Sequence, residues 1–163
     1  MKTKLTLLDR TLEWTLVALM GVLVFAVLWQ VASRYLFASP SSWTEEIARF
    51  LLIWIGMLGA AYAFRHNLHI GLDLLPQKLK GNAALNLHRF TQAVIILFAF
   101  CVLVVGGSSL VYLTWDLRQY SAVLRLPVSV LYSVIPLAGL LIIIFTLAAW
   151  STPPESSNDE ELN

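Results

Sequence analysis

Long apolar stretches alternate with short polar segments along the chain of 163 residues, and almost no charged residue falls inside the apolar stretches. A helix of about 20 apolar residues crosses the hydrocarbon core of a bilayer. The pattern therefore predicts an all-α integral membrane protein with four transmembrane helices at about residues 12–37, 44–65, 90–115 and 126–150. The second helix reaches membrane length only by including the polar turn at its start.

The polar segments complete a single membrane domain over residues 1–150. Residues 66–89 place apolar side chains such as Ile70 and Leu74 among charged ones such as Lys78. This mixture is typical of short helices that lie at the membrane interface. Residues 151–163 are polar and acidic, which predicts a disordered tail.

Basic residues indicate the orientation in the membrane, because cytoplasmic segments carry an excess of lysine and arginine. With the N-terminus inside, the cytoplasmic segments carry Lys2, Lys4, Arg10, Arg65, Lys78, Lys80 and Arg89. The opposite side then carries Arg34, Arg49, Arg118 and Arg125. The bias predicts that both termini are cytoplasmic.

Composition narrows the class of protein further. Hydrophobic residues make up 58% of the chain and charged residues 13%, whereas a soluble domain has about a quarter charged residues. The net charge of +1 gives no support for a nucleic-acid partner. Lys2 and Lys4 before an apolar run could suggest a signal peptide, but the run is too long and no small-x-small cleavage site closes it. The single cysteine, Cys101, is interpreted as a small packing residue.

The middle parts of all four predicted spans lack acidic, basic and histidine residues. Proton relays and ion-coupled substrate sites place such residues inside the membrane, and haem-binding bundles need axial ligands there. We therefore expect no enzyme activity, no cofactor and no direct binding of a transported substrate. The chain is interpreted as a subunit whose surroundings are membrane lipid and other proteins.

The start of the second span carries the most specific group of polar residues. Ser42 and Glu45 have the spacing of a capping box, and Glu45 and Arg49 lie four residues apart on one helix face. Arg34, at the end of the first span, is joined to this end by a short loop and could reach Glu46. The cluster fits a charge-neutralised helix start anchored by Trp43, a docking surface for a polar partner or, least well, a catalytic acid pair.

Three other features are candidates for structure or contact. Gly56 and Gly59 each precede an alanine by four residues, a small-xxx-small spacing that lets helices approach closely and that also arises by chance. His69 and Asp73 are four residues apart and close to His66, which suits a metal site or a plain surface pair. Pro136 predicts a bend in the fourth span.

Several motifs resemble the small membrane subunit of tripartite ATP-independent periplasmic (TRAP) transporters, over about residues 10–150. The most specific is Arg34-Tyr35-Leu36-Phe37, then Pro40, then Trp43-Thr44-Glu45-Glu46-Ile47-Ala48-Arg49. Matching positions continue through Trp54, Gly59-Ala60, Arg65, His69-Ile70, Asp73, Leu126-Pro127-Val128, Tyr132 and Pro136.

The resemblance implies a system of three proteins in a bacterial inner membrane. A periplasmic solute-binding protein captures an organic acid such as a dicarboxylate or a sialic acid. A large membrane subunit carries the solute by an elevator motion coupled to sodium. The small subunit would clamp the large one and help to dock the binding protein, through contact residues that include Arg34, Trp43, Glu45, Glu46, Arg49, Gly56, Gly59, His69 and Asp73. An independent four-span channel, or an accessory subunit of another membrane complex, is the alternative.

Overall fold

The computed structural model describes residues 2–36, 41–66 and 82–149, and all regular secondary structure in these ranges is helical. Four helices are long and apolar enough to cross a membrane, at Leu7–Leu36, Ser42–Arg65, Arg89–Asp116 and Val128–Ala148. The prediction of an all-α membrane protein with four spans is confirmed. Residues 67–81, which hold His69 and Asp73, and the acidic tail 151–163 lie outside the described residues.

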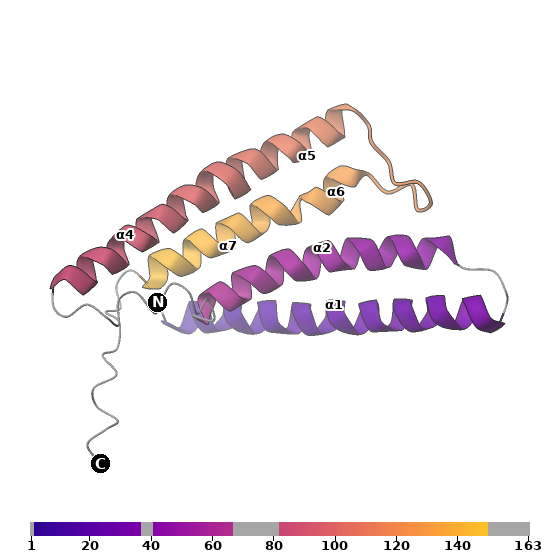
Figure 1. Ribbon diagram of the computed structural model, residues 1–163, viewed down its shortest axis with the longest axis horizontal. Coiled ribbons are helices and arrows are strands. Elements are labelled where there is room, and N and C mark those ends of the chain that lie inside the picture. The colour runs from indigo at the N-terminus through magenta and orange to yellow at the C-terminus, as the bar shows by residue number, and fades with distance from the viewer. Residues whose placement is uncertain (1, 37–40, 67–81, 150–163) are drawn as a thin grey trace, which may run out of the picture.

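The first two spans are single helices and the last two are composite. The elements in chain order are α1 (Lys2–Leu36), α2 (Ser42–Arg65), α4 (Asn82–Phe98), the π-helix η2 (Ala99–Gly106), α5 (Gly107–Asp116), α6 (Val128–Tyr132) and α7 (Val134–Ala149). α4, η2 and α5 form one continuous rod, and α6 and α7 form the last span. α1 begins and α7 ends at the same end of the molecule (Figure 1).

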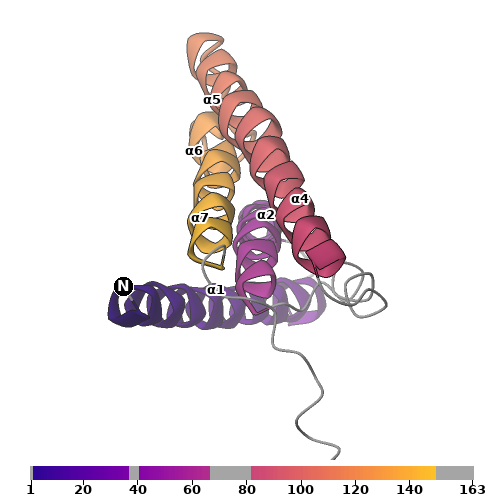
Figure 2. The same ribbon diagram turned by 90° about the vertical axis from the view of Figure 1, so that its left-hand side faces the viewer.

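The helices stand in single file rather than in a compact bundle. α2 packs on α1 and on α7, and α7 packs in turn on η2, so the spatial order is α1, α2, α7 and then the α4–η2–α5 rod (Figure 1). In Figure 2, α1 runs across the view while α2 is seen nearly end on, so these two helices cross. About a third (33%) of the apolar window in the last span, formed by α6 and α7, is buried, against 6% in the first span. The row therefore offers two broad faces to its surroundings.

The apolar core lies where α1, α2 and α7 meet. Leu12, Leu58, Val134 and Phe145 form its buried cluster, and residues such as Leu16 and Trp54 pack against it. Lipid tails are as apolar as these side chains, so the association of the helices depends on close fit rather than on release of water.

Two glycines set the closest approach between neighbouring helices. A Cβ atom added at Gly139 would lie 2.7 Å from the Cβ of Leu103, and one added at Gly107 would lie 2.9 Å from Cγ2 of Ile135. Both contacts are shorter than real Cβ atoms make, so these positions require glycine. They join α7 to the third span.

The composite spans differ from the sequence prediction in two ways. α4 begins at Asn82, before the predicted span, because no proline or glycine follows Gly81 to stop the helix there and Ala83 and Ala84 favour it. The part of this helix that is apolar enough to cross a membrane begins at Arg89. The η2 segment was not expected, because the apolar pattern of residues 99–106 does not distinguish a π-helix from an α-helix.

The interruption expected from Pro136 is present. α6 ends at Tyr132, a turn follows at Ser133, and α7 starts at Val134. Proline has no backbone N–H, so the carbonyl of Tyr132 loses its helical donor. The next bond, from the amide of Leu137 to the carbonyl of Ser133, is stretched to 3.4 Å.

Candidate functional site at the loop end

The loop end of the row is the end at which α2 begins and at which residues 117–127 connect α5 to α6. There the hydroxyl of Thr44, which is fully buried, donates to the carbonyl of Ser41 at 2.8 Å and also contacts the Ser41 hydroxyl. The hydroxyl of Ser33 in α1 donates to the carbonyl of Gln30 at 2.9 Å and lies 3.5 Å from the Ser41 hydroxyl. These contacts fasten the end of α1 to the start of α2.

The predicted capping box is wrong. Ser42 is already the first helical residue, and Ser41 is the N-cap. The side chain of Ser41 makes no capping hydrogen bond, because its hydroxyl is taken up by Thr44 and Ser33. The sequence offered several serines and threonines at this point, and only the packing of α1 against α2 decides which of them meet.

Glu46 points inward along the row and holds the 117–127 loop. Its carboxylate accepts hydrogen bonds from the amide of Val123 at 3.1 Å and from the amide of Leu124 at 2.8 Å. Charge-assisted bonds of this kind are about twice as strong as neutral ones. The expected contact between Glu46 and Arg34 is not formed: the ion pairs among the described residues do not include it, and both loop amides bind Oε2 of Glu46. Arg34 is exposed in the last turn of α1, where the helix dipole favours a cation.

The 117–127 loop is closed by its own backbone. The amide of Ser121 donates to the carbonyl of Leu126 at 2.9 Å, and the amide of Val128 donates to the carbonyl of Gln119 at 3.0 Å. The loop turns through two arginines in the left-handed region, Arg118 with φ of 47° and Arg125 with φ of 53°. Glu46 thus pins a preformed loop over the start of α2, and sequence reasoning missed this contact.

The outward face of α2 carries the other predicted contact residues. Arg49 and Glu45 form the expected ion pair at 3.2 Å, with side chains 70% and 62% exposed. Such an exposed pair contributes little to stability. The same face continues along the helix at intervals of three or four residues, and we call it the α2 stripe: Glu45, Arg49, Leu52, Gly56 and Ala60, all exposed.

The two glycines of α2 are open. A Cβ atom added at Gly56 or Gly59 would have no atom within 4 Å. Among the described glycines, close helix approach is therefore made by Gly107 and Gly139, which sequence reasoning did not single out, and not by Gly56 or Gly59. Trp43, at the start of α2, is 45% exposed and continues the outward surface at the loop end.

The opposite end of the row is fastened by one arginine. Nε of Arg65 in α2 donates to Oδ2 of Asp9 in α1 at 3.2 Å, and its guanidinium carbon lies 5.9 Å from the ring centre of Phe145 in α7. His66 packs against the ring of Tyr62 with 4.4 Å between ring centroids. Arg65 thereby joins three helices.

The described residues give no support to metal chemistry. Within residues 2–36, 41–66 and 82–149, no three histidine, cysteine, aspartate or glutamate side chains converge. The suggested site at His66, His69 and Asp73 includes two residues outside these ranges. At the loop end, one side of α2 binds the 117–127 loop through Glu46. The other side, the α2 stripe, is exposed.

Comparison with known proteins gives a family and several relatives. The model of the family described as "Tripartite ATP-independent periplasmic transporters, DctQ component" matches residues 13–153. The chain is 35% identical over 130 residues to a protein of Haemophilus influenzae named as a TRAP transporter small permease protein, covering 78% of this chain and 76% of that one. It is 30% identical over 90 residues to the sialic acid TRAP transporter small permease protein SiaQ of Vibrio cholerae, covering 55% of this chain and 52% of that one.

A further relative is much longer than this chain. The sialic acid TRAP transporter permease protein SiaT of another Haemophilus influenzae strain is 33% identical over 88 residues, which is 52% of this chain but 12% of that protein. A segment similar to this chain thus occurs inside a larger permease polypeptide.

Proposed function

Because the chain belongs to the DctQ component family of tripartite ATP-independent periplasmic transporters, we propose that it is the scaffold subunit of a sodium-coupled importer of an organic acid. Members of this family are transporter components rather than enzymes, in the inner membrane of bacteria. In the proposed assembly the chain holds a large membrane subunit that carries the solute, and a periplasmic binding protein delivers the solute to it.

The observation that carries the proposal is the α2 stripe. α2 is an inner member of the row, with α1 and α7 on either side, yet one of its faces is unfilled from Glu45 to Ala60. In a bilayer, small residues favour close approach of helices, and an open line of them suits a helix of another subunit. The segment similar to this chain inside the longer SiaT supports a position next to a larger membrane protein.

The single-file fold suits a static support. An elevator mechanism needs one part that stays at constant depth while another slides past it. Four crossing spans in a row give a wide contact with lipid, and ties at both ends hold the row together, at Glu46 and at Arg65. The middle parts of the spans hold no charged residue with which to bind the solute or sodium.

The loop end is the proposed docking side for the binding protein. With the termini in the cytoplasm, as the basic residues predict, the loop end faces the periplasm. Trp43, Arg34 and the 117–127 loop pinned by Glu46 would then form the surface that meets the binding protein. Glu45, Arg49, Gly56 and Gly59 would face the large subunit, and His69 and Asp73 stay proposed contact residues from the resemblance alone.

The test is reconstitution of the transporter with and without this chain. The large subunit and the binding protein are placed with proteoliposomes under an inward sodium gradient, and uptake is measured with succinate and sialic acid as the probes. We expect one of the two probes to be taken up, and only when this chain is present and the sodium gradient is imposed. Equal uptake without the chain would remove the scaffold role, and a pure homo-oligomer with its own conductance would favour the independent channel.

A further inference from the structure

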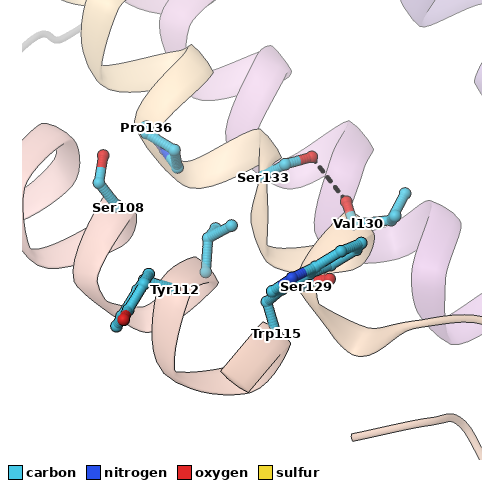
Figure 3. Close-up of a pocket in the computed structure, with 8 residues that line it drawn as sticks. Ser108, Tyr112, Trp115, Ser129, Val130, Ser133 and Pro136 are labelled. Carbon is cyan, nitrogen blue, oxygen red and sulfur yellow. Dashed lines mark hydrogen bonds between the residues drawn. The ribbon is translucent and has the colours of Figure 1, made fainter. Parts of the chain in front are cut away.

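A cavity of about 510 Å³ lies between the third and fourth spans near the loop end (Figure 3), and no residue of the α2 stripe lines it. α5 lines one side of the cavity, and α6, the following turn and the start of α7 line the other. The lining residues are Ser108, Val111, Tyr112, Trp115, Ser129, Val130, Ser133 and Pro136.

One hydroxyl in this lining is buried and unsatisfied. The side chain of Ser133 donates to the carbonyl of Val130 at 2.6 Å (Figure 3), but the hydroxyl of Ser129 has no hydrogen-bond partner although the residue is only 3% exposed. A buried polar group without a partner is rare and destabilising, most of all in a bilayer that offers no water. Ser129 therefore points to a partner that comes from outside the chain.

The depth of the cavity identifies the region of the membrane that it faces. Trp115 lies next to the end of the third span at Asp116, where indole rings sit at the headgroup level. Ser108 is seven residues earlier in the sequence, which is roughly 10 Å deeper at 1.5 Å per residue. The cavity thus runs from the headgroup level, past the glycerol esters, into the acyl region.

The rim of the cavity opens toward lipid. The side chains of Tyr112, Trp115 and Val130 are 72%, 67% and 55% exposed, so the surroundings of the chain reach the cavity from the side. The lining combines hydroxyls and an indole N–H, which donate hydrogen bonds, with apolar groups of Val111, Val130 and Pro136. No charged side chain lines it.

We propose that this cavity binds one phospholipid of the leaflet at the loop end. The hydroxyl of Ser129 donates to an oxygen of the glycerol ester or phosphate, and the indole N–H of Trp115 supplies a second donor. The first part of an acyl chain covers Val111, Val130 and Pro136. Because the lining is uncharged, a zwitterionic headgroup fits it as well as an anionic one, so the site selects the glycerol region rather than the headgroup.

The test is lipid retention measured by native mass spectrometry. The full chain is reconstituted in nanodiscs of phosphatidylethanolamine, released into mild detergent and measured for bound lipid. We expect one phosphatidylethanolamine per chain. Val111→Trp fills the cavity and should lower its occupancy at least about tenfold, and Ser129→Ala removes one donor and should lower it about two- to tenfold.

Leu97→Trp is the matched control. Leu97 is 64% exposed on the same rod and does not line the cavity, so the same substitution there should leave retention unchanged. Absence of retained lipid in the wild type, or equal retention by the wild type, Val111→Trp and Ser129→Ala, would overturn the proposal. Cross-linking from position 111 to another polypeptide in native membranes, in place of lipid, would also overturn it and assign the cavity to a protein side chain.

Discussion

Two pairs of glycines in this chain do opposite things. Gly107 and Gly139 lie where the third and fourth spans touch, with no room for a methyl group, whereas Gly56 and Gly59 in α2 have no neighbour within 4 Å of an added Cβ. The neighbouring residues Glu45 and Glu46 differ in the same way. Glu46 binds the amides of the 117–127 loop, and Glu45 pairs only with Arg49 on the outward face.

The difference separates residues that build the chain from residues left over for a partner. A small residue already in close contact has its role in the fold. One that is open on an inner helix of the row has no such role, and under the proposed function it serves assembly with the large subunit. The two groups should therefore fail in different experiments, which gives the comparison four tests.

The largest effect is expected from overfilling the internal contact. Gly139→Leu would place a side chain against Leu103 and Val104, and overpacking of this kind costs about 1–3 kcal/mol or more. The free energy of unfolding in mixed detergent micelles, followed by circular dichroism, measures it. Gly59→Leu in the isolated chain should not lower that free energy, because an added Cβ meets no atom there and leucine has a better helix propensity than glycine. Equal losses in the two variants would abolish the distinction.

Binding to the large subunit, in contrast, should be sensitive to substitution at Gly59. Gly59→Leu should weaken co-purification with the large subunit about tenfold, which corresponds to about 1.4 kcal/mol. Gly21→Leu in α1 is the matched control, because an added Cβ at Gly21, as at Gly59, has no atom within 4 Å, and Gly21 lies on α1 rather than on α2. Wild-type recovery of the complex with Gly59→Leu would show that α2 faces lipid.

Alanine substitutions sharpen the comparison by predicting opposite signs. Gly107→Ala meets Cδ of Pro136 at 3.0 Å and its backbone nitrogen at 3.1 Å, so it should destabilise the isolated chain by about 1 kcal/mol despite the better helix propensity of alanine. Gly56→Ala meets nothing and should stabilise it by up to about 1 kcal/mol. The same unfolding titration reports both, and a gain at Gly107 would mean that α5 and α7 are less closely packed than described.

The smallest effects are expected at the glutamates. Glu46→Gln weakens the acceptor for the amides of Val123 and Leu124, and hydrogen exchange at these two amides should accelerate several-fold. Glu45→Gln removes only an exposed ion pair, worth about 0.2–1 kcal/mol, and should leave the loop exchange unchanged. Similar exchange in the two variants would show that Glu46 does not hold the loop.

The features that could be predicted from the sequence depend only on residues that are close together in it. The spans follow from runs of apolar residues, the ion pair of Glu45 and Arg49 follows from spacing along one helix, and the break before Pro136 follows from its missing N–H. Each of these needs only neighbours in the sequence.

Contacts between distant segments could not be predicted. Glu46 meets Leu124 and Asp9 meets Arg65 only because α2 lies beside α1 at one end and near the 117–127 loop at the other. In a membrane protein, residues that face lipid and residues that face a neighbouring helix are both apolar, so periodicity does not reveal helix order. For the same reason glycines inside a contact, such as Gly139, look like glycines outside one.

The spatial order of the helices has a consequence for biosynthesis. α7 is the last of the described helices in chain order, yet it stands between α2 and the α4–η2–α5 rod (Figure 1). Until it is inserted, the α1–α2 hairpin and the rod have little to bind to in each other, and Gly107 and Gly139 cannot meet their neighbours across the gap. The four described spans therefore become one body only when α7 is inserted between its two neighbours, so during synthesis the first three spans have to wait in the membrane for the fourth.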